Sequence, residues 1–494
     1  MITMLTLVPV LAPLVGAVVF LVAGWRPATA WLSAVSAALV LAAGIGAAVA
    51  VATAGSHTAL GGLVRVDALS AFMLIVIGAV GSLATAATPA YLSAEIRAGR
   101  ASPRTATRHS LLVQAFLAAM ALAVLAADLG VLWIAIEATT IVTAFLVGQR
   151  RTRSAVEAAW KYVVICSTGI ALALLGTLLL NYAARHSPGA PGLDWAGLVA
   201  GAHALDPGVT RIAVALLVIG FGTKAGLAPL HAWLPDAHSQ APAPVSALMS
   251  GVLLSVAFYA ILRVKVIADA ALGIGFARAL LIVMALASLV LAASLLVAQR
   301  DYKRMLAYSS IEHMGLLALG AAVGGPLAAA AVLLHILGHG LAKGVLFLGA
   351  GHVLQTTGAS RIGEVRGLAA RQPLVAGCLG FGMLALIGMP PFSVFASELG
   401  IARAGFASGL GWATAAALLL VLVIAAALLT HTSRMLLGSP PDSPGAATAA
   451  GPRLPVFAAT ALLGGLAVCA GLGVTAGPLT DLLASAAAIL VGTP

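Results

Sequence analysis

The chain has 494 residues, of which 62% are hydrophobic and only 8% are charged. A soluble globular domain carries about 25% charged residues, so this composition excludes a water-exposed surface over most of the chain. The net charge of +11 would suit a nucleic-acid-binding protein, but the basic residues stand singly or in small groups between apolar stretches. The composition therefore predicts a membrane protein.

Fourteen apolar stretches are long enough to cross a hydrocarbon core about 30 Å thick, which takes about 20 residues each. Helices satisfy their own backbone hydrogen bonds inside lipid, and these long stretches lack the alternation of a β-barrel. We therefore predict an all-α membrane protein. A final stretch, 478–491, is too short to cross and is expected to lie at the membrane interface. The predicted spans are 4–24, 30–52, 67–88, 111–128, 130–148, 158–182, 211–230, 242–263, 277–298, 305–324, 327–353, 374–402, 409–431 and 455–475.

Basic residues are concentrated in the loops that follow odd-numbered spans, such as 97–108 and 150–153. The positive-inside rule places such loops in the cytoplasm. We therefore expect a multi-pass protein of the cytoplasmic membrane with both termini outside. Lys303 is expected in one of these loops, whereas Arg263 and Lys265 are expected at the end of an even-numbered span.

The three cysteines, Cys166, Cys378 and Cys469, are far apart within apolar stretches. No C-x-x-C motif or Cys/His run is present, so no metal, iron–sulfur cluster or haem is expected in this chain.

Ionisable residues inside the predicted spans are the first candidates for function. A charged group at the bilayer centre costs about 2.5–3.5 kcal/mol or more. Two of these residues, Lys161 and Glu312, lie nearest to predicted helix ends, where a side chain can reach the surface, and they are the weaker candidates. The six residues are Glu137, Lys161, Lys224, Glu312, Lys343 and Glu398.

Glu137 lies half-way along its span with no opposite charge within one helical turn. Its partner must come from another helix, and Lys224 is the best candidate. A carboxylate keeps a buried lysine charged, and separating the pair favours loss of the lysine proton. The sequence thus predicts a switchable ion pair.

His335, His339 and Lys343 are spaced i, i+4 and i+8, so they share one helix face. A histidine relays protons near neutral pH, and alignment with a lysine favours a proton path. Two alternatives remain open. An H-x-x-x-H pair can bind zinc if a third ligand comes from elsewhere, and both histidines could be core residues satisfied by their neighbours.

The seventh and twelfth spans contain helix-breaking residues beside a charged one. Interrupted spans in corresponding positions of two halves are a sign of inverted repeats with a central site. We therefore predict two inverted five-helix repeats, spans 4–8 and 9–13, with broken helices 7 and 12. The breaking residues are Gly220, Gly222, Gly226 and Pro229 in the seventh span and Gly388, Pro390 and Pro391 in the twelfth.

This organisation divides the chain into four segments. They are an N-terminal three-helix segment (1–110), a first half-channel repeat (111–265), a second half-channel repeat (266–435), and a C-terminal helix and tail (436–494).

One long segment carries a family resemblance. GTKAGLAPLHAWLPDAHSQAPAPVSALMSGVLL, at 222–254, resembles the signature of the antiporter-like subunits of respiratory complex I, multisubunit cation/proton antiporters and membrane-bound hydrogenases. The IEHMG and FASELG motifs are similar to hydrogenase-4 component F, of the formate hydrogenlyase type of membrane arm. Supporting matches are VDALS at 66–70, LWIAIE at 132–137, and the runs at 301–315 and 335–351.

The resemblance implies a proton-translocating membrane subunit that couples redox energy to H⁺ movement and has no redox centre of its own. Iron–sulfur clusters, with a nickel–iron centre or quinone as further candidates, would belong to partner subunits. Glu137 and Lys224 would form the coupling pair of the first half-channel. His335, His339 and Lys343 would carry protons along the axis, and Glu398 would be the exit-side group.

The sequence departs from the family at Ser255, where a lysine or histidine is usual in the eighth span. A serine holds no proton, so the relay would use ordered water, or His231 and His238 nearby, or it would be interrupted. Two other functions therefore stay open. One is a subunit of a multisubunit Na⁺ (cation)/H⁺ antiporter, and the other is a non-pumping membrane scaffold.

Overall fold

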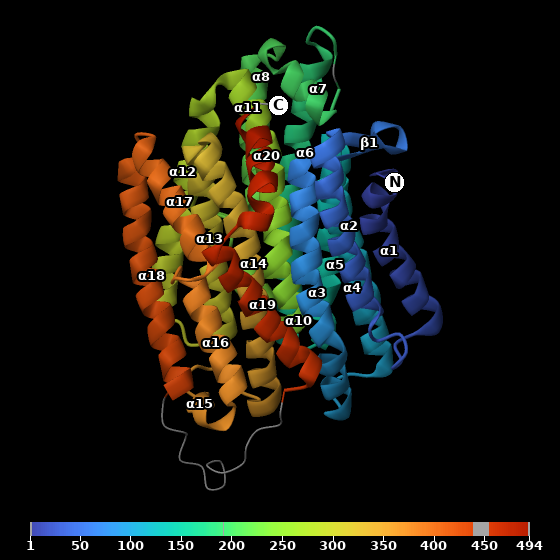
Figure 1. Cartoon of the computed structure of the whole chain (residues 1–494), viewed down its shortest axis with the longest axis vertical. Coiled ribbons are helices and arrows are strands. Elements are labelled where there is room, and N and C mark those ends of the chain that lie inside the picture. The colour runs from blue at the N-terminus through green and yellow to red at the C-terminus, as the bar shows by residue number, and fades with distance from the viewer. Residues whose placement is uncertain (1, 191, 438–453, 493–494) are drawn as a thin grey trace.

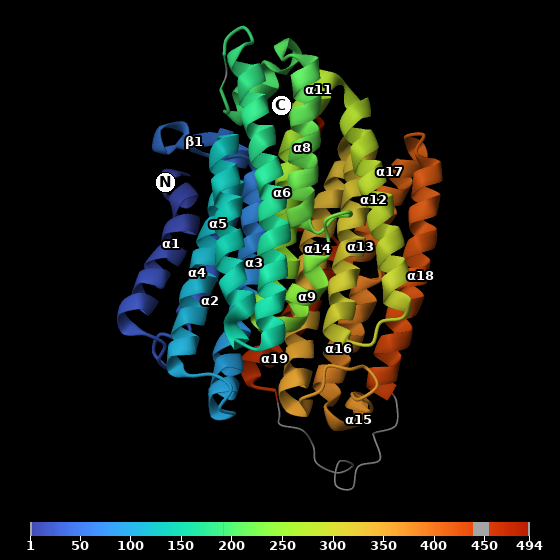
Figure 2. The ribbon, with the colours of Figure 1, turned by 180° about the vertical axis from the view of Figure 1, so that it is seen from behind.

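The computed structural model describes residues 2–190, 192–437 and 454–492. Thirteen helices in this part of the chain are long and apolar enough to cross a membrane. They stand side by side with their long axes roughly parallel (Figures 1 and 2). The predicted all-α membrane fold is confirmed. The one predicted span that is not among these thirteen, 374–402, is formed by two shorter helices, Pro373–Leu386 and Ser393–Ala407.

The N-terminal segment contains three long helices and one small hairpin. Strand β1 (His57–Ala59) pairs antiparallel with β2 (Val64–Val66) near the N-terminus. The helices are α1 (Ile2–Ala23), α2 (Leu32–Ala54) and α3 (Ala68–Arg97), with a 3-10 turn η1 (Leu60–Gly62) inside the hairpin.

Hydrogen bonds and an ion pair of Asp67 fix the start of α3. Asp67 caps the helix by accepting from the Ser70 amide (2.9 Å), and the Ser70 hydroxyl accepts from the Asp67 amide (2.8 Å). Both Asp67 carboxylate oxygens also accept from Arg263 of α11 at 2.8 Å. The Arg263 guanidinium lies 4.4 Å from the centroid of the Trp195 ring. This buried ion pair ties the N-terminal segment to the first repeat.

Two groups of five spans follow, and each has a broken helix in its fourth position. Because five crossings bring the chain to the opposite side, the second group is inverted relative to the first. The first group is α4 (Pro103–Leu125), α5 (Leu129–Val147), η2 (Gly148–Arg150), α6 (Arg153–Arg185), α7 (Trp195–Ala200), η3 (Ala202–Ala204), α8 (Pro207–Ala225), α9 (Trp233–Gln240), α10 (Ala243–Leu248), the π-helical turn η4 (Met249–Leu253) and α11 (Leu254–Leu272). The second is α12 (Ile274–Val297), α13 (Tyr302–Val323), α14 (Gly325–Thr357), α15 (Leu368–Arg371), α16 (Pro373–Leu386), α17 (Ser393–Ala407) and α18 (Gly411–Leu437).

The two breaks lie where the sequence predicts them, between α8 and α9 and between α16 and α17. Gly226 ends α8 with φ +79°, and a Cβ there would lie 2.4 Å from Leu234 Cδ1. Trp233 closes this break by donating from Nε1 to the Thr223 carbonyl (2.9 Å). Gly388 has φ +67° in the second break, a conformation that favours glycine.

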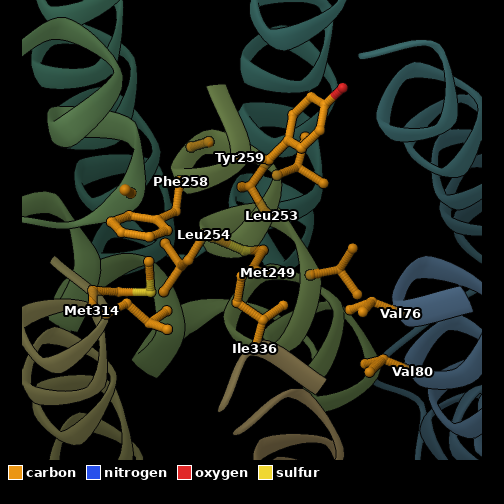
Figure 3. Packing of buried hydrophobic residues seen from close by; sticks show 14 of the residues in the cluster. Val76, Val80, Met249, Leu253, Leu254, Phe258, Tyr259, Met314 and Ile336 are labelled. Atoms are coloured by element: carbon orange, nitrogen blue, oxygen red, sulfur yellow. The ribbon is translucent and has the colours of Figure 1, made fainter. Parts of the chain in front are cut away.

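The apolar core lies where α3, α11, α13 and α14 meet. Figure 3 shows Val76 and Val80 of α3 facing Met249 of the π-helical turn, with Ile336 of α14 beside Met249 and Met314 of α13 further from it. All five side chains are almost fully buried. This dry packing surrounds the polar groups described below.

Several helix ends differ from the prediction. Helices α3, α6 and α14 are longer than the apolar stretches 67–88, 158–182 and 327–353, because the helical backbone continues past the hydrophobic part into polar turns. Helix α11 likewise extends to Leu272. It therefore includes Arg263 and Lys265, which the sequence places at a span end, and both are buried. Lys303, also expected in a loop, is buried in the first turn of α13.

The position expected for 478–491 is wrong. After α19 (Val456–Val474) and a 3-10 turn (Gly477–Leu479), helix α20 (Thr480–Val491) packs lengthwise against α3, α11 and α14. Figure 1 shows α19 and α20 rising in succession toward the C-terminal end. An Ala-rich face with buried Leu483, Ala486 and Ala487 allows this close approach. Of the predicted C-terminal segment, 438–453 lies outside the described residues.

Candidate functional site

The first polar cluster surrounds Lys224, which is fully buried in the last turn of α8. Its ammonium donates to Thr140 Oγ1 of α5 (2.8 Å) and to the hydroxyl of Tyr162 of α6. Tyr162 packs edge-on against Trp233 at the helix break (centroids 5.0 Å apart). Three helices and the break therefore hold one lysine.

The predicted direct ion pair between Glu137 and Lys224 is not formed. Glu137 lies one turn before Thr140 on α5 and is close enough to Lys224 for an electrostatic interaction. Its buried Oε2 has no hydrogen-bond partner among the described residues. Neutral hydroxyl groups occupy the positions around the ammonium that the carboxylate was expected to fill.

A second cluster surrounds Lys343 of α14, which is also fully buried. Its ammonium donates to the Leu306 carbonyl (2.6 Å) and to Ser309 Oγ (2.6 Å). Glu312, one turn further along α13, is 2% exposed and interacts electrostatically with Lys343. From the sequence, Glu312 ranked as a weaker candidate because it was expected near a helix end. That expectation is wrong, because Glu312 lies near the middle of α13.

Hydroxyl groups adjoin the Lys343 cluster. The π-helical turn before α11 carries Ser250, whose hydroxyl is 2.8 Å from that of Ser310 on α13. Ser310 in turn donates to the Leu306 carbonyl (3.1 Å), the oxygen that also accepts from Lys343. Ser255 is fully buried on α11, and its hydroxyl has no partner among the described residues. A π-helical turn is often found at a functional site.

The third cluster is formed by histidines. His313 Nδ1 of α13 is 3.0 Å from His335 Nε2 of α14, and His335 Nδ1 is 2.9 Å from Ser397 Oγ of α17. The His339 ring centroid is 4.9 Å from that of His313. His238 of α9 stacks on Phe347 of α14 (5.0 Å) and interacts electrostatically with His339.

Sequence reasoning missed His313 and Ser397. His313 follows Glu312 and Ser397 precedes Glu398, and both glutamates were predicted site residues. A polar residue in an otherwise apolar helix was the signal that could have found His313 and Ser397. Glu398 belongs to the same region, because its carboxyl lies near His313, His335 and the break at Gly388. His335, His339 and Lys343 thus follow one another on α14, and Glu398 lies near His335.

Lys161 and His231 lie away from this buried row. Lys161 is exposed and forms ion pairs with Glu157 (2.7 Å) and Asp236 (3.0 Å). His231 is half-buried at the α8–α9 break, with its Nδ1 3.2 Å from the Pro229 carbonyl oxygen. Lys161 therefore lies at the surface, as its predicted place near a helix end suggested. His231 and His238 were both proposed to replace Ser255, and of these two only His238 lies among the buried groups.

Two cavities lie at opposite ends of the bundle. One, of about 560 Å³, is polar and is bordered by Lys161, Asp236 and Arg304. The other, of about 490 Å³, contains the Lys265–Asp269 ion pair and Arg278 and reaches Val332, one turn from His335 on α14. The residues 490–492 at the end of α20 also line it.

The three cysteines are free thiols, buried and on separate helices. Among the described residues, one group of side chains has ligand atoms close enough for a metal ion: His313, His335 and Glu398, within 4.8 Å of one another. The sequence left open a zinc site formed by His335 and His339 with a third ligand from elsewhere, whereas the structure groups His335 with His313 and Glu398.

Fold and site together define a polytopic membrane protein with two inverted five-span units and a buried row of lysines, carboxyls and histidines. The sequence pattern of the NADH:quinone oxidoreductase/Mrp antiporter transmembrane family matches residues 126–425. The chain belongs to this family.

Relatives and solved structures agree with that assignment. The chain is 39% identical over 349 residues to a hydrogenase-4 component F homolog of Methylacidiphilum infernorum, covering 70% of this chain and 73% of that protein. It is 33% identical over 348 residues to hydrogenase-4 component B of Escherichia coli, covering 68% of this chain and 49% of that one.

Among solved structures, a chain of the membrane-bound sulfane sulfur reductase, an archaeal respiratory membrane complex, has a TM-score of 0.85 at 26% identity. The two chains are covered to 99% and 97%. A chain of respiratory complex I from Thermus thermophilus has a TM-score of 0.80 at 26% identity, with 99% of this chain and 100% of that chain covered.

Proposed function

We propose that this chain moves protons across the membrane as an antiporter-like subunit of a hydrogenase-4-type or complex I-like oxidoreductase complex. The observation that carries the proposal is the buried row from Lys224 to Glu398, since ionisable groups at membrane depth mark ion and proton pathways. The chain would work with other integral membrane subunits of the cytoplasmic membrane. Iron–sulfur clusters, and a nickel–iron centre or quinone, would belong to peripheral partner subunits.

Proton uptake takes place at the polar cavity bordered by Lys161, Asp236 and Arg304. It lies beside the loop 299–304, on the side that the basic loops assign to the cytoplasm. Helix α9 connects it with the interior, because Asp236 lies in the cavity and His238, two residues on, is buried against Phe347. Both ring nitrogens of His238 lack a partner among the described residues, so both remain available to a proton.

The central transfer runs through Lys343 and the histidines. His238 and Lys343 both interact electrostatically with His339, and the His313–His335 hydrogen bond continues the row toward Glu398. Protons leave through the outer cavity, whose wall residue Val332 is one turn from His335.

Lys224 acts as the controlling charge of the first half. Its neutral partners, Thr140 and Tyr162, hold the ammonium without neutralising it. Movement of Glu137 toward or away from Lys224 would change that charge. The hydroxyls of Ser250 and Ser310 extend from the Lys343 cluster, and this hydroxyl path would take the place of the lysine that is missing at Ser255.

The test is proton pumping in membrane vesicles that contain the assembled complex. We expect Lys224→Ala and Glu137→Gln each to abolish pumping while dye-linked electron transfer by the complex stays mostly intact. Matched controls are Arg185→Ala and Glu364→Gln, because both residues are exposed and outside the buried row. Wild-type pumping in Lys224→Ala and Glu137→Gln would refute the assignment.

The same vesicles separate the two other functions. Ion movement that depends on Na⁺ and persists without electron transfer would identify a cation/proton antiporter subunit. Electron transfer with no ion movement in the wild type would identify a scaffold.

A further inference from the structure

Three side chains with metal-binding atoms come together from three helices: His313 of α13, His335 of α14 and Glu398 of α17. Their ligand atoms all lie within 4.8 Å of one another, and the two nearest ring nitrogens are 3.0 Å apart. A tetrahedral zinc ion with bonds of 2.0–2.1 Å to imidazole nitrogens keeps its ligands about 3.3 Å apart. The two ring nitrogens are already near this spacing, and the carboxylate would move inward by up to about 1.5 Å to complete the group around a metal.

The hydrogen bonds of Ser397 orient His335 for coordination. The Ser397 hydroxyl donates to the Val394 carbonyl (2.7 Å), so its oxygen accepts from His335 Nδ1 (2.9 Å). With the proton on Nδ1, the lone pair of His335 Nε2 points at His313. An outer hydrogen bond that fixes the tautomer is the usual arrangement around a metal-binding histidine.

Unsatisfied atoms around the group point to a missing ligand. Glu398 Oε1 and His313 Nε2 are buried without a hydrogen-bond partner among the described residues, and so are both ring nitrogens of His339. His313 and His339 are fully buried. Buried polar atoms are nearly always paired, so such a concentration of unpaired ones requires an explanation.

We infer that His313, His335 and Glu398 bind a divalent transition-metal ion of the Zn²⁺ class, with His339 or water as the fourth ligand. Two imidazoles and a carboxylate suit zinc and its neighbours better than Mg²⁺ or Ca²⁺. A second carboxyl, Glu312, lies near Glu398 and adds to the attraction for a dication.

Glu398 is the one ligand of the three that is partly exposed. The approach to the site is the outer cavity, whose wall residue Val332 is one turn from His335. Once bound, the metal replaces the proton shared by His313 and His335. It therefore blocks the proton relay. This consequence rests on the proposed function, but the metal binding itself does not.

The test uses the purified intact complex with Co²⁺ as a spectroscopic probe. We expect one equivalent of Co²⁺ with the strong visible absorption of a tetrahedral ion, which Zn²⁺ then displaces. His313→Gln and His335→Gln should both lose this absorption. His231→Ala should keep it, because His231 lies at the other break.

Folding of each variant is checked by thermal unfolding, so that a loss of absorption in a folded variant is meaningful. Absence of the tetrahedral spectrum in the wild type, or its survival in both folded glutamine variants, overturns the metal site. Binding in the wild type together with unchanged pumping in Zn²⁺ supports the site and contradicts the relay. The two proposals therefore fail separately.

Discussion

Lys224 and Lys343 are both fully buried, and each ammonium donates to neutral oxygens rather than to a carboxylate. Leaving one partner of a buried ion pair uncompensated is strongly destabilising. Because each ammonium is held by hydroxyl or carbonyl groups, losing its proton breaks no direct ion pair. Such lysines are suited to repeated protonation and deprotonation.

The hydroxyl path gives a prediction at the same scale. Ser310→Ala removes the partner of Ser250, so we expect proton transport to fall by about one to two orders of magnitude, the smaller end of what a positioned proton-transfer group contributes. Ser294→Ala is the matched control, since Ser294 is exposed and bonds only the Val290 carbonyl of its own helix. Equal transport rates in both variants, measured in vesicles, would exclude the hydroxyl path.

The Asp67–Arg263 ion pair gives a prediction on stability. Burial raises the pKa of Asp67, but the Arg263 guanidinium and the Ser70 hydrogen bonds outweigh burial and hold the pKa below its ordinary value of 3.8. The contribution of this carboxylate to stability is therefore complete above pH 3.8 and is lost as pH falls through the lower folded value.

Asp67→Asn should lower the free energy of unfolding by about 3–5 kcal/mol at neutral pH, because it leaves a buried guanidinium without its counter-charge. The three buried, free cysteines allow a thiol-reactive dye to follow unfolding. The exposed Asp481→Asn serves as the control. An unchanged melting temperature in Asp67→Asn would show that the pair contributes nothing.

Sequence reasoning located the charged residues of the site but not their partners. A lysine in an apolar stretch is visible in the sequence, whereas the approach of Thr140 and Tyr162 to Lys224 depends on how α5 and α6 pack. From the sequence, Glu137 was paired with Lys224 because charge was considered, but not the neutral hydroxyl groups that could hold the ammonium. His313 was overlooked because one histidine beside a glutamate gives no periodic signal.

At the scale of elements, glycine and proline predicted both helix breaks, because glycine permits non-helical backbone angles and proline removes a helix hydrogen bond. The position of α20 was missed for the opposite reason. Its length of 12 residues excludes a full crossing, and only the tertiary structure shows that α19 and α20 follow one another up the bundle.

The contact between α19 and the second break is testable with two glycines of one helix. A Cβ at Gly473 would lie 1.9 Å from the Pro391 carbonyl oxygen, whereas a Cβ at Gly471 would meet nothing within 4 Å. Gly473→Ala should therefore destabilise the protein by about 1–3 kcal/mol, as overpacking does. Gly471→Ala should be stabilising by about 0.5–1 kcal/mol, because alanine favours a helix interior. Equal melting temperatures would show that α19 does not press on the break.

At the scale of the whole molecule, the relay groups on α13, α14 and α17 (His313, His335, Lys343 and Glu398) lie in the second repeat, while Lys224 on α8 lies in the first. This part of the path and its control are thus in different halves of the bundle. This arrangement suits a subunit that receives a signal on one side and moves an ion on the other.

Orientation in the membrane is testable on one helix, α6, which runs the height of the bundle. We expect His186→Cys to react with an impermeant maleimide on intact cells and Ser154→Cys to react only in inverted vesicles, as the basic loops predict. Both positions are exposed, and the native cysteines are buried, which keeps the background low. The reverse labelling pattern would invert the assigned direction of uptake.

The end of α20 has a practical consequence for anyone who handles this protein. Because 490–492 lines the outer cavity, an affinity tag fused to the C-terminal end begins beside the proposed exit. A polyhistidine tag there would add both bulk and metal-binding groups at that opening. A tag before α1, which packs mainly against α2 and α4, leaves the cavity as it is and is the safer choice for transport and metal-binding measurements.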